Sequence, residues 1–220
     1  MRSSYKSFIH IPVSCLLFGF FMLVRATGFA QEQPIGEGIA KAKVIAGTTV
    51  FLYSGELIDD LLHHAVKKDS ITFVKGAHHT EIGTAPAWFV PEWQKTDYDM
   101  LYLRVVSIAR NWLEVIVNRY TGQTAWVERQ ALSYLNWPEF LLEVFSVELI
   151  PSKKNPLRLK PADHASVAAD PGGRASLKPL AVRGDWIKVS LAGPPGTVPV
   201  LGWIRWKKGD QMWINWSPLS

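Results

Sequence analysis

Two pairs of adjacent histidines, His63-His64 and His78-His79, are the residues of this chain whose type could support metal chemistry. Successive residues on a helix point about 100° apart, so at most one histidine of each pair could join a single site. No HExxH or comparable spacing accompanies either pair. We therefore expect surface histidines, and the sequence predicts no metal site.

Acidic and hydroxyl side chains also lack the spacing of a catalytic group. Glu56, Asp59 and Asp60 gather at the start of a predicted helix, where carboxylates stabilise the helix dipole. Ser107 has no G-x-S-x-G setting. The glycines of residues 193–196 enclose two prolines and precede no Lys-Ser/Thr, so this segment is not a phosphate-binding loop. The sequence therefore predicts a protein that is not an enzyme, with no catalytic residue and no cofactor.

Tryptophan is the residue type that carries a functional signal. The chain has 10 Trp among 220 residues, several times the ordinary usage. Exposed indole rings stack on sugar faces and on proline residues of peptides. The candidate ligand-binding residues are Trp88, Trp93, Trp206, Trp213 and Trp216. Two alternatives stay open: small β-domains need large rings to bury enough area, and Trp137 could pack between two domains.

Two segments of the chain repeat one pattern. The first covers residues 109–115 and 122–127, and the second covers 182–189 and 202–204. Each has a short polar turn, a Trp, an alternating strand, a glycine-containing turn, and a second strand that begins near another Trp. The repeat predicts two β-hairpins.

The alternation within each hairpin separates a core face from an outer face. Period 2 places Leu113, Val115 and Val117 together on one face of their strand, which is the natural core face. The four Trp residues of the repeat are expected to cover the ends of small cores; they are Trp112, Trp126, Trp186 and Trp203.

Short strand patterns separated by Gly, Pro and Asp turns recur through most of the remaining chain, which favours an all-β barrel or sandwich. Residues 57–66 are the exception, because Leu57, Leu61 and Ala65 have helical spacing. A polar, glycine-rich segment at residues 31–40 precedes the first strand pattern and is expected to be a loose leader.

These hairpins resemble the bacterial SH3-like (SH3b) domain family. Its usual form is a Trp-x-x-Val strand followed by a Gly-Trp-Val strand. Residues 186–189 with 201–204 match that form well. Residues 112–115 with 124–127 depart from it, since Ala125 replaces the glycine. The resemblance is good over roughly residues 147–206 and partial over 43–135.

The resemblance implies an all-β fold of two tandem small SH3-like β-barrels. The first would span residues 43–140 and carry an insertion at 54–99 that contains the short helix, and the second would span 141–220. Residues 31–42 would form a flexible leader.

The first 30 residues have the layout of a secretory signal peptide. Arg2 and Lys6 give a cationic start, residues 11–24 form an apolar run of 14 residues, and small residues precede Ala30. The run is shorter than the ~18–20 residues that cross a bilayer. We expect cleavage after Ala30 or Ala26, no stable membrane span afterwards, and a periplasmic or extracellular location. An uncleaved anchor is the alternative.

Cleavage would also change composition. Cys15 is the only cysteine and lies inside the apolar run, so the exported chain could form no disulfide or thiolate site. Loss of Arg2, Lys6 and Arg25 would leave 21 basic residues against 19 acidic ones. A net charge of about +2 leaves no nucleic-acid-binding signature.

The sequence and the resemblance together predict an exported, non-catalytic binding module. Its expected partner is cell-wall glycan–peptide (peptidoglycan) or a protein of the cell envelope. The alternative is a structural or assembly component of the envelope, in which the Trp residues only hold the two barrels together.

Overall fold

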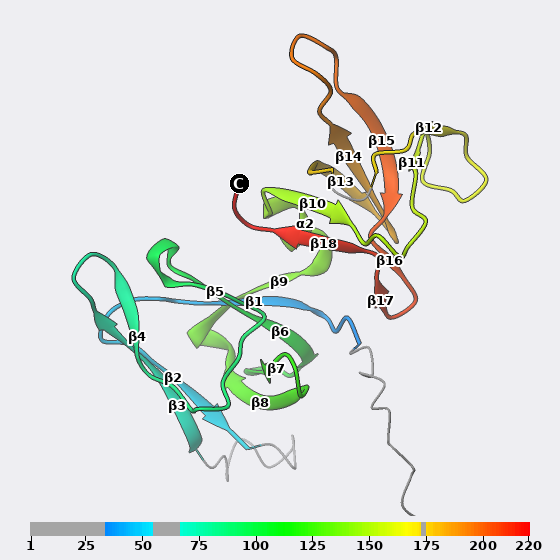
Figure 1. The fold of residues 1–220 in the computed structure, drawn as a ribbon. Coiled ribbons are helices and arrows are strands. Elements are labelled where there is room, and N and C mark those ends of the chain that lie inside the picture. Colours follow the sequence, from blue (N-terminus) through cyan, green and yellow to red (C-terminus); the bar gives the residue numbers. More distant parts are fainter. Residues whose placement is uncertain (1–33, 55–66, 173–174) are drawn as a thin grey trace, which may run out of the picture. The chain divides into compact units, whose positions relative to one another are not determined.

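Two large antiparallel β-sheets, one short helix between them and a small separate hairpin make up the described chain (Figure 1). The computed structural model describes residues 34–54, 67–172 and 175–220. The predicted signal peptide and the predicted helix at 57–66 lie outside the described residues. The fold is mostly β, as the strand patterns predicted. Within the described ranges, no helix is long and apolar enough to cross a membrane.

The first sheet has the strand order β4-β3-β2-β8-β7-β6-β1-β9, with β5 paired to β6 (Figure 1). Its strands are β1 (Gly38–Ala42), β2 (Thr49–Tyr53), β3 (Lys67–Lys75), β4 (Thr80–Thr84), β5 (Trp93–Lys95), β6 (Met100–Ile108), β7 (Trp112–Asn118), β8 (Gln123–Glu128) and β9 (Leu132–Asn136). Two 3-10 turns, η3 (Thr96–Tyr98) and η4 (Arg129–Ala131), connect strands.

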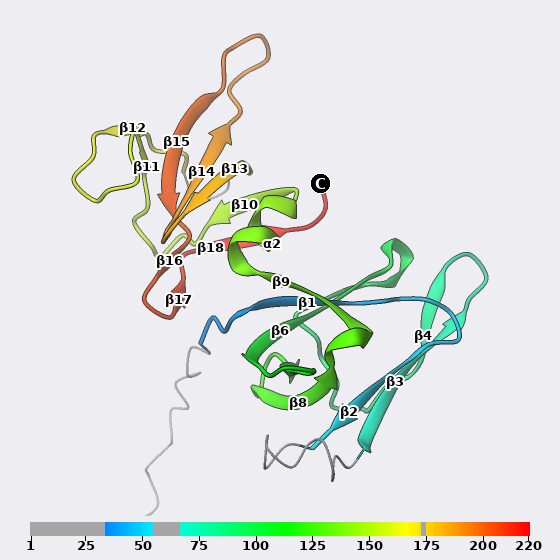
Figure 2. The same cartoon turned by 180° about the vertical axis from the view of Figure 1, so that it is seen from behind.

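The second sheet has the order β12-β11-β15-β14-β13-β10-β18, and Figure 2 shows it from behind. Its strands are β10 (Ser146–Leu149), β11 (Leu157–Arg158), β12 (Val167–Ala169), β13 (Leu177–Arg183), β14 (Trp186–Leu191), β15 (Val200–Arg205) and β18 (Ile214–Ser217). A small separate hairpin pairs β16 (Lys207–Lys208) with β17 (Gln211–Met212).

The period-2 pattern of β7 places its apolar residues as predicted. Leu113, Val115 and Val117 are fully buried in the core of the first sheet. That core also takes residues from β2, β3, β6 and β8, so residues 67–95, expected to be an insertion, contribute strands to the same sheet.

The predicted loose leader is wrong at its C-terminal end. Residues 38–42 form β1, which pairs with β6 on one side and with β9 on the other. Ile39 and Ala40 are fully buried. The glycines that suggested flexibility instead permit close backbone approach, because a Cβ at Gly36 or Gly38 would collide with a carbonyl of β6 or β9.

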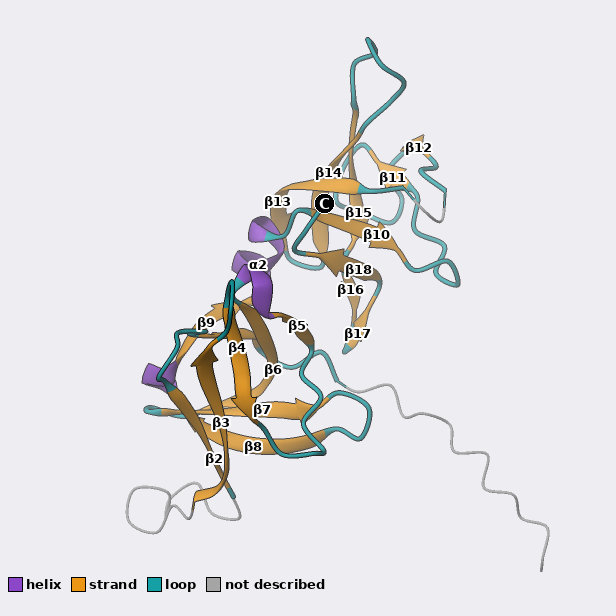
Figure 3. Ribbon diagram, turned by 60° about the vertical axis from the view of Figure 1, so that its left-hand side comes forward, coloured by secondary structure: helices purple, strands orange, loops and turns teal. Residues whose placement is uncertain are grey.

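Helix α2 (Trp137–Glu143) follows β9 and leads into β10 (Figure 3). Asn136 caps it: its side chain accepts from the Glu139 amide, and the Glu139 carboxylate accepts from the Asn136 amide. This reciprocal pair satisfies amides that have no partner within the helix.

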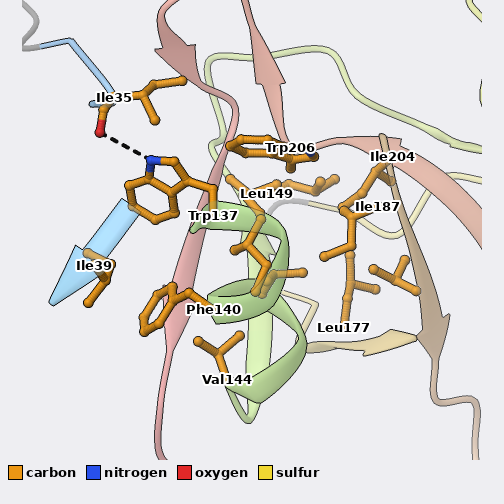
Figure 4. Packing of buried hydrophobic residues seen from close by; sticks show 14 of the residues in the cluster. Ile35, Ile39, Trp137, Phe140, Val144, Leu149, Leu177, Ile187, Ile204 and Trp206 are labelled. Carbon is orange, nitrogen blue, oxygen red and sulfur yellow. Dashed lines mark hydrogen bonds between the residues drawn. The ribbon is translucent and has the colours of Figure 1, made fainter. Parts of the chain in front are cut away.

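One apolar core includes α2 together with residues of both sheets. Ile39 of β1 and Tyr102 of β6 belong to it, as do residues of β10, β13, β14 and β15. Trp137 lies in this core, and Figure 4 shows its indole N–H donating to the Ile35 carbonyl at 3.2 Å. The same N–H also donates to the Gly36 carbonyl at 3.2 Å. The alternative that Trp137 packs between the two halves of the chain therefore agrees with its contacts.

Candidate ligand-binding pockets

The sequence repeat is also a repeat of structure, strand register included. In β7 and β8, Trp112 lies opposite Glu128 and Glu114 lies opposite Trp126. In β14 and β15, Trp186 lies opposite Arg205, and Lys188 lies opposite Trp203. The two hairpins therefore share their register over five residue pairs from the first Trp, with Glu128 and Arg205 at the same position.

Each hairpin forms a pocket where its first Trp meets the end of its second strand. The first hairpin pocket has a volume of about 610 Å³ and is lined by Arg110, Asn111, Trp112, Glu128, Arg129 and Gln130. The second hairpin pocket has about 410 Å³ and is lined by Pro161, Arg183, Gly184, Asp185, Trp186 and Arg205.

The turn between β6 and β7 builds the first hairpin pocket. The Ala109 amide donates to the Trp112 carbonyl at 2.9 Å, and the Arg129 amide donates to the Asn111 carbonyl at 2.9 Å. The first bond closes the β6–β7 turn, and the second holds the residues before β7 against those after β8. They bring Arg110 and Arg129 to the same end of the hairpin.

Tyr53 of β2 supports this pocket from the inside. Its ring meets Trp112 edge-to-face, with 4.8 Å between ring centroids. Its hydroxyl donates to Glu128 Oε1 at 2.7 Å, and Gln130 Nε2 donates to Glu128 Oε2 at 2.7 Å. The hydrogen bond from Tyr53 is the main cause of a lowered pKa at Glu128, so this carboxylate stays charged. Burial, followed by the hydrogen bond and charge of Glu128, raises the pKa of Tyr53 to about 12.

The second hairpin pocket holds an arginine that is already paired. The Arg205 guanidinium binds Asp163 through two hydrogen bonds, Nε to Oδ1 at 3.0 Å and Nη2 to Oδ2 at 2.6 Å. Asp185 lies 3.6 Å from Nη1, and the guanidinium carbon lies 4.5 Å from the centre of the Trp186 ring. The hydrogen bond to Asp163 is the main cause of a raised pKa at Arg205.

The five tryptophans that the sequence predicted as ligand-binding residues do not line one common pocket. Trp206 is 3% exposed, and its indole N–H donates to the Gly184 carbonyl at 2.8 Å. Its prediction as an exposed binding ring is wrong, because the chain after β15 turns this ring toward Trp137. Trp93 and Trp216 are half-buried against the shared core, 5.8 Å apart by ring centroids.

The other two tryptophans predicted to bind a ligand, Trp213 and Trp88, lie in separate places. Trp213 is half-buried, with the ammonium groups of Lys208 and Lys153 at 5.2 and 6.0 Å from its ring centre. Trp88 packs on the core of the first sheet and lines a 130 Å³ cavity with residues that include Lys68 and Asp69. Trp88, Trp93, Trp213 and Trp216 remain predicted ligand contacts without a common pocket.

The residues that the sequence reasoning missed are the charged ones beside the repeat, above all Arg110, Glu128 and Arg129. A signal for them was available, since the polar turn before each Trp is part of the repeated pattern. Within the described ranges, no three His, Cys, Asp or Glu side chains are grouped as metal ligands. His63 and His64 lie outside those ranges.

Comparison with known proteins gives little more. No protein-family model and no curated protein matches the chain. Among solved structures, it is similar to the structure of NlpC2 from Trichomonas vaginalis, with a TM-score of 0.30 and 8% sequence identity. The match covers 79% of this chain and 47% of that one, so this chain spans about half the length of that protein. A TM-score this low supports no conclusion about fold or function.

Proposed function

We propose that this chain is an exported, non-catalytic binding module whose two SH3-like halves recognise cell-wall glycan–peptide or a protein of the cell envelope. The observation that carries the proposal is the pair of pockets at the same position of two hairpins in the same register. If each hairpin is a binding unit, we expect both copies to have a pocket beside the first Trp, as they do.

The first hairpin pocket has the chemistry that a polar ligand requires. An indole ring supplies an apolar surface, and Asn111 and Gln130 supply amide groups beside it. Binding sites combine apolar walls with a few polar groups in this way.

Sedimentation of the mature protein with purified peptidoglycan tests the proposal. Wild type should pellet with the polymer, and Trp112→Ala should weaken binding by ~1 kcal/mol or more, as expected of an aromatic contact. Trp203→Ala is the matched control, because Trp203 is also a half-buried indole of the repeat but lies outside both hairpin pockets. Wild-type protein that stays in the supernatant would exclude the cell-wall ligand.

The export part of the proposal has its own test. Mass spectrometry of protein recovered from the periplasm or medium should give an N-terminus at Gln31, or at Thr27 if Ala26 is the cleavage site. A chain that retains Met1 in the envelope would contradict it.

The packing of several tryptophans favours the second candidate, a structural or assembly component. Trp93, Trp137, Trp206 and Trp216 all pack in or on the core that includes residues of both sheets. If the Trp excess serves only this core, each Trp→Ala variant should lower the melting temperature and none should lose peptidoglycan binding selectively. Melting temperature and sedimentation measured on the same variants separate the two functions.

A further inference from the structure

The two arginines of the first hairpin pocket are not engaged in ion pairs with described residues. Arg110 and Arg129 are exposed, and neither side chain forms an ion pair or hydrogen bond with a described residue. The Arg129 guanidinium has only a ring neighbour, Tyr134, at 6.0 Å. Two guanidinium groups beside one indole are donors without a described acceptor.

The carboxylate of Glu128 also lines this pocket, but it already accepts hydrogen bonds from other residues. Both of its oxygens accept hydrogen bonds, one from Tyr53 and one from Gln130. Its single negative charge leaves the lining with a net positive charge, since Arg110 and Arg129 are both cationic. The described lining therefore suits an anionic ligand.

The second hairpin pocket contains an intramolecular example of such a ligand. There the carboxylate of Asp163 binds the Arg205 guanidinium through two hydrogen bonds, beside Trp186. Asp163 comes from the loop between β11 and β12, outside the hairpin itself. Planar carboxylates fit the fork of guanidinium donors, and this pairing is among the stronger hydrogen-bond arrangements.

We propose that the first hairpin pocket binds the C-terminal carboxylate of a peptide, which takes there the role that Asp163 has toward Arg205. Arg110 and Arg129 would bind the carboxylate, and the Trp112 ring would contact the adjoining peptide group. This inference rests on the proposed binding function and names the ligand group at one of its two pockets. Arg205 of the second pocket is not available to such a ligand, because Asp163 and Asp185 already occupy it.

The test follows the indole N–H signal of Trp112 by NMR, assigned with Trp112→Phe. The probe is N-acetyl-alanyl-alanine with a free carboxylate, and its C-terminal amide is the matched control. The free acid should shift the signal in a saturable way and the amide should not. Arg110→Gln and Arg129→Gln should each weaken binding about tenfold, as expected for a charge-assisted hydrogen bond. Arg183→Gln removes an exposed positive charge from the lining of the second pocket and should leave binding unchanged.

Three outcomes overturn the carboxylate site: acid and amide that bind equally, arginine variants that bind like wild type, or inorganic phosphate that shifts the signal as strongly as the peptide. The last would mean a general anion site. Melting temperatures of the variants should match wild type because both arginines are exposed. Peptidoglycan binding by a wild-type protein that does not bind the peptide would refute this inference alone, whereas peptide binding without peptidoglycan binding would refute only the cell-wall function.

Discussion

At the scale of single residues, the Tyr53–Glu128 pair connects the first hairpin pocket to the stability of the fold. Tyr53 is 5% exposed, and its pKa of about 12 lies above its ordinary value of 10. Below pH 10, the folded and unfolded chains both hold the neutral phenol, so the contribution of Tyr53 to stability is complete. Between pH 10 and 12, the unfolded chain loses this proton while the folded chain keeps it, so the free energy of unfolding falls.

Tyr53→Phe should remove that pH dependence. Urea unfolding of wild type should show a decline steeper than that of the variant by up to ~1.4 kcal/mol per pH unit between pH 10 and 12. Glu128→Gln should retain most of the difference, because burial is the largest cause of the shift. Equal slopes for wild type and Tyr53→Phe would show that the phenol is not protected in the folded state.

Trp206 was predicted as a ligand-binding residue but lies in the core, and its contribution to stability can be measured. Its ring is 3% exposed and lies 6.2 Å from that of Trp137. Trp206→Ala should therefore lower the free energy of unfolding by ~3–5 kcal/mol, measured by chemical denaturation. Trp206→Phe keeps most of the packing and should cost less. A Trp206→Ala protein as stable as wild type would mean that this ring is exposed at the surface.

At the scale of elements, the two hairpins differ at the glycine position of the resemblance motif, and packing explains the difference. Gly202 of β15 lies beneath Leu157 of β11, so that a Cβ there would come within 2.9 Å of Leu157 Cγ. Leu157 is fully buried and has little room to move. Ala125 at the equivalent position of β8 has its Cβ accommodated in the core of the first sheet.

Gly202→Ala should consequently destabilise the protein by ~1–3 kcal/mol through overpacking. Combining it with Leu157→Ala should cost less than the sum of the two single changes, because the second removes the clashing atoms. Ala125→Gly is the reciprocal control and should cost only ~0.5–1 kcal/mol from lost strand preference. Additive costs in the double variant would mean that Leu157 is not the obstacle.

The elements that the sequence predicted are those with a strong local period. The alternation of residues 112–118 identifies both β7 and its buried face. By contrast, β1 begins in the polar segment that contains Gly36 and Gly38 and was predicted to be loose, since its strand character comes from pairing with two distant strands. Pro138 is the second residue of helix α2. In the sequence this proline suggests a break in the chain, but with the Asn136–Glu139 capping pair it is typical of a helix start.

The binding pockets were harder to predict than the strands. The sequence shows that Trp112 and Trp186 are equivalent. It does not show that Arg205 pairs with Asp163 of the β11–β12 loop, whereas Arg110 and Arg129 pair with no described residue. Trp206 likewise looks like any other extra tryptophan until the path of the chain after β15 is known. Such pairings depend on contacts between residues far apart in the chain, which no local pattern encodes.

At the scale of the whole molecule, residues 33–220 form one compact unit, and α2 is where the cores of its sheets are joined. Phe140 contacts Tyr102 of β6 and Trp216 of β18, with ring centroids 5.8 and 4.8 Å apart. Trp137 contacts Trp206 and donates to the backbone before β1. A shared core of this kind couples the unfolding of both sheets.

Trp137→Ala should weaken that coupling. In wild type, the most protected amides of β7 and β14 should exchange with equal opening free energies, because both exchange only when the whole unit unfolds. Removal of the indole opens a cavity in the shared core, which should cost ~3–5 kcal/mol and separate the two values. Hydrogen exchange measured by NMR gives both values in one sample. Unequal values in wild type that Trp137→Ala leaves unchanged would mean that the sheets are independently stable and that α2 only connects them.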